Sequence, residues 1–498
     1  MSKYSNDFLA SIVVFLVALP LCMGIAVASG APVSAGLITG ILGGIVVGIL
    51  GGAPLQVSGP AAGLAVIVWE LIHKHGFEAI GAIILVGGLI QVIAGLAKLG
   101  GWFRAVSPAV IHGMLAGIGV LILVGQFHIM LDDAPKGSGI KNILAIPDAV
   151  MKGIMPLDGS SHHLAALIGI MTIVSMVLWN NYRPKKLKAL PGPLIGVVVG
   201  SLVAAALQMK VSFVQVPENF LATIKPLSWD LFLAAISRTE TLLAGAALAL
   251  IASAETLLCA SATDQMHSGS RTRYDRELAA QGVGNVLCGL FGGLPMTGVI
   301  VRSATNVDAG ARTRVSAILH GVWILLFVVT LPFVLALVPT STLAAVLVFV
   351  GYKLVNVAAI RDLRRYGKAQ VAIYFATLMM IVATDLLTGV ATGFALAVLK
   401  TLYDHIHLSV RVTPSREGGR STISLDGSAT FLHIPRLAAA IESVPLDQEI
   451  ELLIDRLVSI DHGCLELLKA RQKAGGKITV CWDTLQARGR GRRECHSD

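Results

Sequence analysis

Long apolar segments dominate the chain, and their length constrains its fold class. Several are close to the roughly 20 residues that an α-helix needs to cross a bilayer, whereas a β-barrel would show shorter alternating strands. Only 14% of the residues are charged, against roughly 25% in soluble domains. We expect an all-α polytopic membrane protein with about fourteen transmembrane segments. These are 8–29, 34–52, 59–72, 78–98, 105–130, 163–180, 190–207, 239–263, 278–291, 301–311, 315–338, 341–357, 369–385 and 386–403.

Basic residues predict the orientation. If the N-terminus is cytoplasmic and each segment crosses once, compact basic clusters fall in the cytoplasmic loops, at 183–188, 271–276, 312–314 and 361–368. The opposite loops are longer and mix acidic residues with lysines. This positive-inside pattern predicts a multi-pass protein of the cytoplasmic membrane, with both termini inside. It also explains the net charge of +9 without a nucleic-acid partner.

Two of the segments, 59–72 and 301–311, are short. At about 1.5 Å per residue they span about 21 and 15 Å, against a hydrocarbon core of roughly 30 Å. Each follows a Gly-Gly-x-Pro sequence, so extended chain at 55–58 and 296–300 must complete each crossing. Such backbone survives in a membrane only inside protein or along a cavity. Interrupted segments at corresponding places in two halves point to a transporter site.

The starts of these two half-helices carry the features of an anion site. A helix N-terminus offers free amides and the equivalent of about +0.5 charge. Pro60 suits a first helical turn, and Ala61, Ala62 and Gly63 leave the amides uncovered. Arg302 adds a full charge at the other start. An intramembrane arginine usually marks a substrate pathway; the alternative is a structural pair with a carboxylate.

Glu255 is the second singular residue, because it lies in an otherwise apolar helix. It can carry a coupling proton, bind sodium, or neutralise Arg302. The six cysteines show no paired spacing, the histidines show no metal-site spacing, and no nucleotide loop or nucleophile motif is present. We therefore expect no metal, no cofactor and no enzyme activity, with energy supplied by a proton or sodium gradient.

After residue 407 the pattern changes to short strands (421–425, 451–455, 477–482) alternating with helices (435–443, 463–474). This predicts a membrane domain at 1–407 followed by a small α/β domain at 408–485. A basic tail at 486–498 is either solvated or in contact with anionic lipid.

Several motifs together resemble the SulP family of anion transporters. They are Val17-Ala-Leu-Pro20 with Gly30-Ala-Pro32, and Val301-Arg302-Ser303 with Ala309-Gly310-Ala-Arg312-Thr313. The C-terminal module resembles a STAS domain, with Ile460-Asp461-His462-Gly463 at its Asp-x-Ser turn.

The resemblance implies a seven-plus-seven inverted repeat, in which core helices 1–4 and 8–11 move against gate helices 5–7 and 12–14. It also implies a homodimer with elevator-type alternating access, and a coupling-ion site at Glu255 and Cys259. The implied anion site lies between helices three and ten. Its residues are Leu21, Cys22, Gly59, Pro60, Ala61, Ala62, Val301, Arg302 and Ser303.

Departures from the family pattern refine this expectation. Leu21 and Val301 stand where many relatives have glutamine and serine, so the site relies more on backbone amides and Arg302. Glu255 and Cys259 replace an Asp and a Thr of the sodium-coupled bicarbonate branch, which favours proton coupling or exchange. In the STAS module, Gly463 replaces a phosphorylatable serine, so switching by phosphorylation is not expected there.

The N-terminal third resembles a bacterial branch often paired with carbonic anhydrases. Bicarbonate is therefore favoured as the anion, with sulfate close behind. The alternatives are a nucleobase permease of the same architecture, whose site would use acidic residues on helices eight and ten, and an anion channel or sensor with the STAS module as its output.

Overall fold

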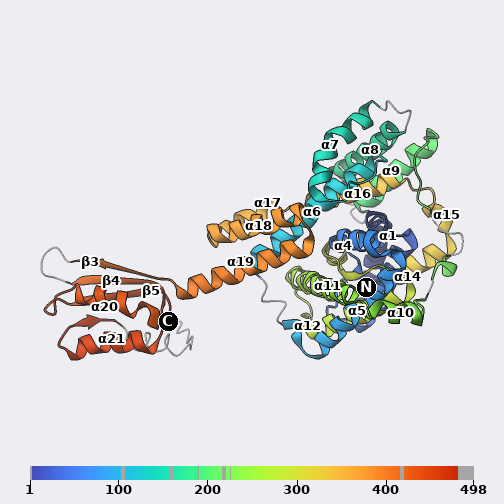
Figure 1. The fold of residues 1–498 in the computed structure, drawn as a ribbon. Helices are drawn as coiled ribbons and strands as arrows, with labels where there is room; N and C mark the ends of the chain where they lie inside the picture. Colours follow the sequence, from blue (N-terminus) through green and yellow to red (C-terminus); the bar gives the residue numbers. More distant parts are fainter. Residues whose placement is uncertain are drawn as a thin grey trace. The chain divides into compact units, whose positions relative to one another are not determined.

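The computed structural model describes residues 3–101, 107–155, 161–184, 187, 190–215, 220–224, 226–414 and 420–480. The chain divides into two compact units, Met1–Phe394 and Ala395–Asp498 (Figure 1). The boundary falls inside one helix, α19 (Leu386–Ile406).

The first unit is almost wholly helical. Its first half contains α1 (Lys3–Ala28), α2 (Val33–Leu42), the π-turn η1 (Gly43–Val47), α3 (Gly48–Leu50), β1 (Ser58–Pro60), α4 (Ala62–His75), α5 (Phe77–Leu96), α6 (Pro108–Met130), α7 (Gly139–Ile154), α8 (His162–Tyr182) and α9 (Gly192–Ala206). Its second half contains η4 (Leu221–Thr223), α10 (Trp229–Ile236), α11 (Thr239–Gln265), α12 (Tyr274–Phe291), β2 (Met296–Gly298), α13 (Ile300–Asp308), α14 (Val315–Thr330), α15 (Pro332–Leu335), α16 (Thr340–Leu354), α17 (Val357–Arg365) and α18 (Lys368–Ala383).

Each of the fourteen predicted apolar segments coincides with helical structure. Within the described ranges, seven helices are long and apolar enough to cross a membrane, and four more are apolar but shorter. Fourteen crossings therefore stay a prediction. Among the described residues, three α-helices were not predicted: α7 and α10 lie in segments interpreted as outer loops, and α17 follows α16 as a short basic helix.

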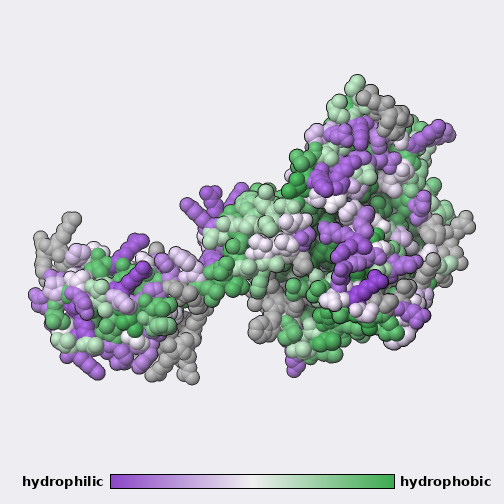
Figure 2. Space-filling view, viewed as in Figure 1, coloured by the Kyte–Doolittle hydropathy of each residue, from purple (hydrophilic) through white to green (hydrophobic). Residues whose placement is uncertain are grey.

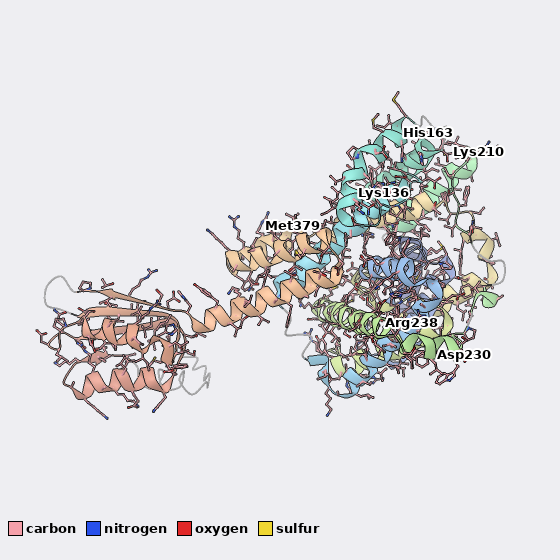
Figure 3. The ribbon with its side chains drawn as sticks, in the orientation of Figure 1. Lys136, His163, Lys210, Asp230, Arg238 and Met379 are labelled. Carbon is pink, nitrogen blue, oxygen red and sulfur yellow. The ribbon has the colours of Figure 1, made fainter. Side chains whose placement is uncertain are left out.

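The surface of the helical unit is apolar in a way that suits lipid contact. Figure 2 shows hydrophobic residues along the left side and lower edge of its visible face, and hydrophilic residues across the middle. Leu96, Leu144 and Met379 are each at least 60% exposed, and Met379 lies on α18 (Figure 3). Charged residues labelled in the same view lie outside the long helices or at their ends, as Lys136 before α7 and Arg238 before α11 do.

The helices of this unit pack in two sets of contacts. In one set α5 packs on α11 and α12, and α1 packs on α2 and α14; in the other α6 packs on α16 and α18, and α8 on α9. Small residues permit the closest approaches. A Cβ on Gly36 in α2 would overlap the carbonyl oxygen of Cys22 in α1, and one on Gly44 would lie 2.6 Å from Cα of Gly321 in α14. The division into a moving core and a gate stays a prediction.

The second unit contains a four-stranded sheet of order β3-β4-β5-β6. Its elements are β3 (Leu408–Thr413), β4 (Ser421–Ala429), η5 (Phe431–His433), α20 (Ile434–Glu442), β5 (Ile450–Ile460), α21 (His462–Lys473) and β6 (Ile478–Thr479). Strand β3 is antiparallel to β4, whereas β4, β5 and β6 are parallel. Helices α20 and α21 lie on the same side of the sheet (Figure 1).

The core of this second unit lies between the sheet and its two helices. Ile423, Leu452, Leu437 and Leu468 are all buried there. Asp461 caps α21, since its Oδ1 accepts from the amide of Cys464 at 2.9 Å. The sequence missed β3. The predicted strand at 477–482 is present as β6, and its last two residues lie outside the described part of the chain. The predicted basic tail lies outside the described residues, and the STAS assignment stays a prediction.

We predict that Gly36→Ala destabilises the helical unit while Gly125→Ala does not. The first substitution forces α1 and α2 apart, and overpacking of this kind costs about 1–3 kcal/mol. The second adds a Cβ that meets no atom within 4 Å and raises helix propensity by about 0.5–1 kcal/mol. Thermal unfolding of both variants in detergent tests this pair; equal midpoints would contradict the close packing of α1 on α2.

Candidate functional site

Two extended segments far apart in the sequence pair at the centre of the site. Strand β1 runs antiparallel to β2, with Ser58 opposite Gly298 and Pro60 opposite Met296. The extended chain predicted before each half-helix is therefore present, and its backbone is paired. One prediction was wrong: Gly59 and Pro60 lie in β1, so Pro60 does not begin the helix.

Both short helices begin immediately after these strands. Helix α4 starts at Ala62 with Ala61 as its N-cap, and α13 starts at Ile300 with Val299 as its N-cap. Neither N-cap side chain hydrogen-bonds to the helix. Because the strands are antiparallel, the helices leave the ribbon at opposite ends. Two uncapped N-termini, each carrying partial positive charge, thus flank one three-residue ribbon.

Arg302 lies in the first turn of α13 and is completely buried. Its Nε, Nη1 and Nη2 have no hydrogen-bond partner among the residues that the structure describes. None of the carboxylates in those residues forms an ion pair with it either, so the alternative of a structural pair is not what the structure shows. A Cβ on Gly59 would overlap its Nη1. The guanidinium therefore lies directly against β1, where only glycine leaves room for it.

The predicted residues from α1 lie beside this arginine. Cys22 is fully buried, and its thiol lies close enough to the Arg302 guanidinium for a weak contact, although the geometry does not make it a hydrogen bond. Leu21 is also buried, in the main apolar core. On α13, Val301 is 37% exposed, which separates it from its buried neighbours Arg302 and Ser303.

Ser303 supports the backbone of the site. Its Oγ accepts from the amide of Val57 at 3.0 Å and donates to the carbonyl of Val299 at 2.8 Å. The amide of Val299 in turn donates to the carbonyl of Val57 at 2.9 Å. The hydroxyl thus ties the chain before β1 to the first turn of α13.

Glu255 on α11 lies at the start of α4. A Cβ on Gly63 would be 2.9 Å from both of its carboxylate oxygens. Its Oε2 is buried and has no hydrogen-bond partner in the described part of the chain. One acidic group thus lies at the N-terminus of α4, and one basic group lies in the first turn of α13.

Cys259, predicted beside Glu255 at the coupling-ion site, contacts other groups. Its Sγ lies 3.6 Å from Oγ of Ser303 and 3.9 Å from Oγ1 of Thr263. Thr256, which lies between Glu255 and Cys259 in the sequence of α11, bonds to the ribbon. Its Oγ1 accepts from the amide of Gly298 at 3.2 Å. The sequence analysis missed Thr256, although a hydroxyl next to Glu255 in an apolar helix was a usable signal.

A second set of residues, which the sequence analysis missed, holds the chain that leads into β1. Glu277 on α12 is 1% exposed. Its Oε2 accepts from the amides of Gly52 and Ala53 at 2.7 and 2.9 Å, and its Oε1 accepts from Nε2 of Gln56 at 2.8 Å and of Gln281 at 3.0 Å. This carboxylate thus gives hydrogen-bond partners to the backbone amides that follow the end of α3.

Asn285, one turn beyond Gln281 on α12, does the same for β2. It accepts from the amide of Met296 at 2.7 Å and donates to its carbonyl at 3.1 Å. It also donates to Oε1 of Gln91 on α5 at 2.7 Å. Glu277, Gln281 and Asn285 recur every four residues on a helix that is otherwise apolar after its first turn, and this spacing was the signal that could have revealed them.

The described residues contain no group of three or more His, Cys, Asp or Glu side chains able to hold a metal ion. Within the described part of the chain, the arrangement instead offers a guanidinium without a hydrogen-bond partner, two uncapped helix N-termini and one carboxylate whose Oε2 has no partner. Together the arginine and the helix ends can hold a small anion, and the carboxylate can take up a proton or a cation.

Comparison with known protein families and curated proteins gives consistent matches. The model described as the sulfate permease family matches residues 4–377. YvdB of Bacillus subtilis, named as a candidate sulfate transporter, is 30% identical over 410 residues, covering 80% of this chain and 73% of the relative. The bicarbonate transporter BicA of a Picosynechococcus species is 25% identical over 416 residues, covering 80% and 70%.

Solved structures support the fold. The transmembrane domain of a cyanobacterial BicA superposes with a TM-score of 0.68 at 23% identity, covering 78% of this chain and 98% of that one. Murine Slc26a9, an anion transporter captured in its inward-facing state, gives 0.75 at 14% identity, covering 97% and 87%. At these identities the likeness establishes a mostly helical, polytopic membrane fold.

We predict that Ser303→Ala lowers the unfolding midpoint, because it leaves the buried amide of Val57 without a partner. The loss of one partner of a buried hydrogen bond costs about 1–3 kcal/mol. Thr305→Ala is the matched control, since its hydroxyl bonds only to the carbonyl of Val301 at an exposed position. Thermal unfolding in detergent measures both, and a Thr305→Ala midpoint as low as that of Ser303→Ala would refute the assignment.

Proposed function

Because this chain belongs to the sulfate permease family, whose named relatives are transporters rather than enzymes, we propose that it is a secondary transporter of a small inorganic anion. The anion is held between the N-termini of α4 and α13, against the guanidinium of Arg302. Leu21, Cys22, Gly59, Ala61 and Ala62 line the site, with the other predicted residues close by.

The observation that carries this proposal is the buried, unpaired Arg302. An ion removed from water without a partner costs several kcal/mol, so a fold rarely retains one unless a ligand completes it. The uncapped amides at the two helix starts add hydrogen-bond donors and partial positive charge, which favour an anion as Arg302 does. Arg302 also argues against the nucleobase permease alternative, because that alternative expects an acidic residue on helix ten, although Glu255 on helix eight would fit it.

The charges around the site bear on which anion is carried. Two helix ends contribute about +0.5 each, and Arg302 contributes one unit, giving about +2. Bicarbonate together with an ionised Glu255 balances this charge. Sulfate balances it when Glu255 is protonated. We favour bicarbonate, which the BicA relatives are named for, with sulfate close behind.

The charge balance between the anion, Glu255 and the positive groups also gives a coupling mechanism. A dianion at Arg302 makes ionisation of Glu255 unfavourable, so sulfate would enter with a proton, whereas bicarbonate would exchange without one. Sodium fits less well, because the Cys259 sulfur is a poor ligand for a hard cation and contacts Ser303 and Thr263.

The remaining features of the proposal rest on the family resemblance. They are a homodimer in the cytoplasmic membrane, cytoplasmic termini, a STAS domain, and elevator-type movement of a core carrying α4 and α13 past a gate. A carbonic anhydrase is the class of enzyme that would supply or consume bicarbonate beside such a transporter.

We predict that Arg302→Ala abolishes anion uptake in proteoliposomes. Removing one partner of a buried charge pair costs about 2–5 kcal/mol, which is a loss of about 30-fold or more in affinity. Labelled bicarbonate and sulfate uptake are measured with Arg361→Ala, an exposed arginine of α17, as the control. Gly59→Ala serves as a second variant, because it displaces only the tip of Arg302. Undiminished uptake by Arg302→Ala would remove the site assignment.

We further predict that Glu255→Gln shifts selectivity from bicarbonate toward sulfate and makes sulfate uptake independent of an imposed proton gradient. The neutral amide mimics the protonated carboxyl. Loss of a unit charge near the anion should change the uptake ratio by about tenfold or more, equivalent to about 1.4 kcal/mol. Glu240→Gln, at the exposed start of the same helix, is the control. An unchanged ratio would exclude Glu255 from coupling.

A further inference from the structure

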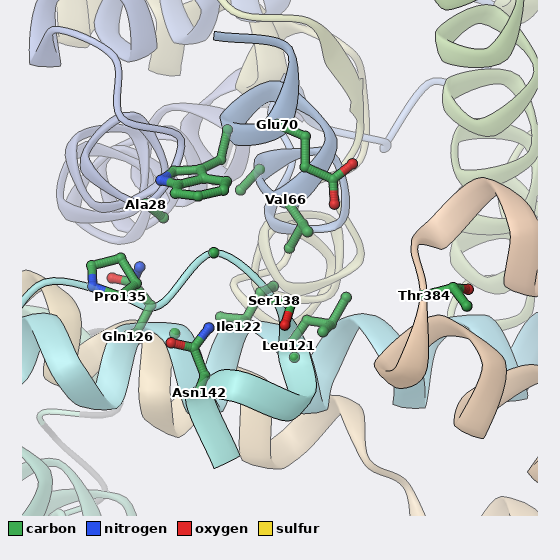
Figure 4. A pocket seen from close by; sticks show the side chains of 15 residues that line it. Ala28, Val66, Glu70, Leu121, Ile122, Gln126, Pro135, Ser138, Asn142 and Thr384 are labelled. Carbon is green, nitrogen blue, oxygen red and sulfur yellow. The ribbon is translucent and has the colours of Figure 1, made fainter. Parts of the chain in front are cut away.

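Basic side chains of the helical unit gather where three helix ends meet. The pocket between α4 and α6 is lined mostly by apolar groups, and none of the residues that line it is basic (Figure 4). Arginines lie instead where the end of α3 meets the starts of α12 and α14. They are Arg273 and Arg276 at the start of α12, and Arg312 and Arg314 just before α14. In the predicted orientation this is the cytoplasmic boundary of the membrane.

Two of these arginines converge on the last residues of α3. Nε of Arg276 donates to the carbonyl of Leu50 at 2.7 Å, and Nη1 of Arg314 donates to the carbonyl of Ile49 at 2.8 Å. These carbonyls belong to consecutive residues, whose Cα atoms are about 3.8 Å apart. Guanidinium groups from two different helices are therefore held close together at a helix C-terminus, where cations are favoured.

Neither of the two guanidinium groups has a direct counter-ion. Among the described residues, no carboxylate forms an ion pair with Arg276 or Arg314, and each guanidinium keeps two of its three nitrogens without a hydrogen bond. The acidic groups of the same region are used by the backbone instead. Glu277, Asp275 and Asp7 each accept hydrogen bonds from backbone amides. The free nitrogens are thus available to an anion from outside the protein.

The two residues that hold the arginines also expose apolar side chains. Ile49 is 51% exposed and Leu50 is 41% exposed. Cationic groups and apolar side chains therefore lie next to each other at the end of α3. A soluble anion would use only the cationic groups, whereas a phospholipid would use both, through its phosphate and its acyl chains.

We propose that an anionic phospholipid binds at the end of α3, with its phosphate against Arg276 and Arg314 and an acyl chain over Ile49 and Leu50. Guanidinium groups suit this task, because their planar fork donates two parallel hydrogen bonds to phosphate oxygens. Basic sites between membrane helices recognise anionic headgroups in this way.

The bound lipid would join three helices. It would link α12 to α14 across the end of α3, from which residues 51–57 lead directly into β1. By holding the end of α3 in place, the lipid would stabilise the chain that enters the anion site. An effect on transport rests on the proposed function; lipid binding itself does not.

Native mass spectrometry of the full-length protein in detergent measures the bound lipid directly. Dioleoylphosphatidylglycerol is titrated, with zwitterionic dioleoylphosphatidylcholine as the comparison lipid. We expect saturable binding of phosphatidylglycerol to the wild type. The double variant Arg276→Gln/Arg314→Gln loses two charge-assisted donors and should bind it about tenfold or more weakly.

The matched control is the double variant Arg361→Gln/Arg364→Gln. It removes the same charge from exposed arginines of α17, in another basic cluster predicted on the same membrane face, and should bind as the wild type does. Ile49→Asn leaves the arginines in place, so it tests the site even if the first double variant does not fold. It should weaken phosphatidylglycerol binding while the unfolding midpoint without lipid stays unchanged.

Four results would overturn the proposal. They are equal losses in the two double variants, binding of phosphatidylcholine as tight as that of phosphatidylglycerol, unchanged binding in Ile49→Asn, and stabilisation by inorganic phosphate that depends on Arg276 and Arg314. The last would assign the arginines to a soluble anion. Arg302→Ala should lose anion uptake and keep phosphatidylglycerol binding. If uptake is never observed but this lipid binding is, the lipid site stands and the proposed transport function falls.

Discussion

The antiparallel contact between β1 and β2 is the interaction on which the rest of the helical unit depends. Two short helices can begin inside the unit only if the extended chain before each has partners for its amides and carbonyls. The strands provide some of those partners for each other. Thr39, Thr256, Asn285 and Ser303 provide others from neighbouring helices. Each of these side chains is buried and bonds to backbone, so a broken bond leaves an unpaired group at the centre.

Within this framework, buried polar groups fall into two kinds. Glu277 and Asn285 have several partners each and hold backbone in place. Other buried groups have atoms without a partner among the described residues, and Arg302 and Oε2 of Glu255 are the charged ones at the starts of the two short helices. In the proposed function these two groups meet the transported ions.

Much of the fold was predictable from the sequence because lipid imposes simple rules. Apolar length predicted where the helices lie, and the shortness of 59–72 and 301–311 predicted broken helices preceded by extended chain. Arg302 and Glu255 stood out because charge is rare in apolar helices. What failed was local detail at the ribbon: Pro60 suits a helix start, but strand pairing with Met296 takes precedence over that propensity. The four-residue spacing of Glu277, Gln281 and Asn285 was visible, yet it does not say what those side chains bind.

The sequence by itself determined the class of protein, the positions of most of its helices and the two charged residues, Arg302 and Glu255, on which the proposed function rests. The tertiary structure decided which groups meet. It placed Arg302 against Gly59, Glu255 against Gly63 and Cys259 against Ser303. Such contacts join residues that are far apart along the chain, and hydrophobic periodicity reports only on neighbours within a helix. Which polar groups remain unpaired, and hence where a ligand belongs, depends on all of those contacts together.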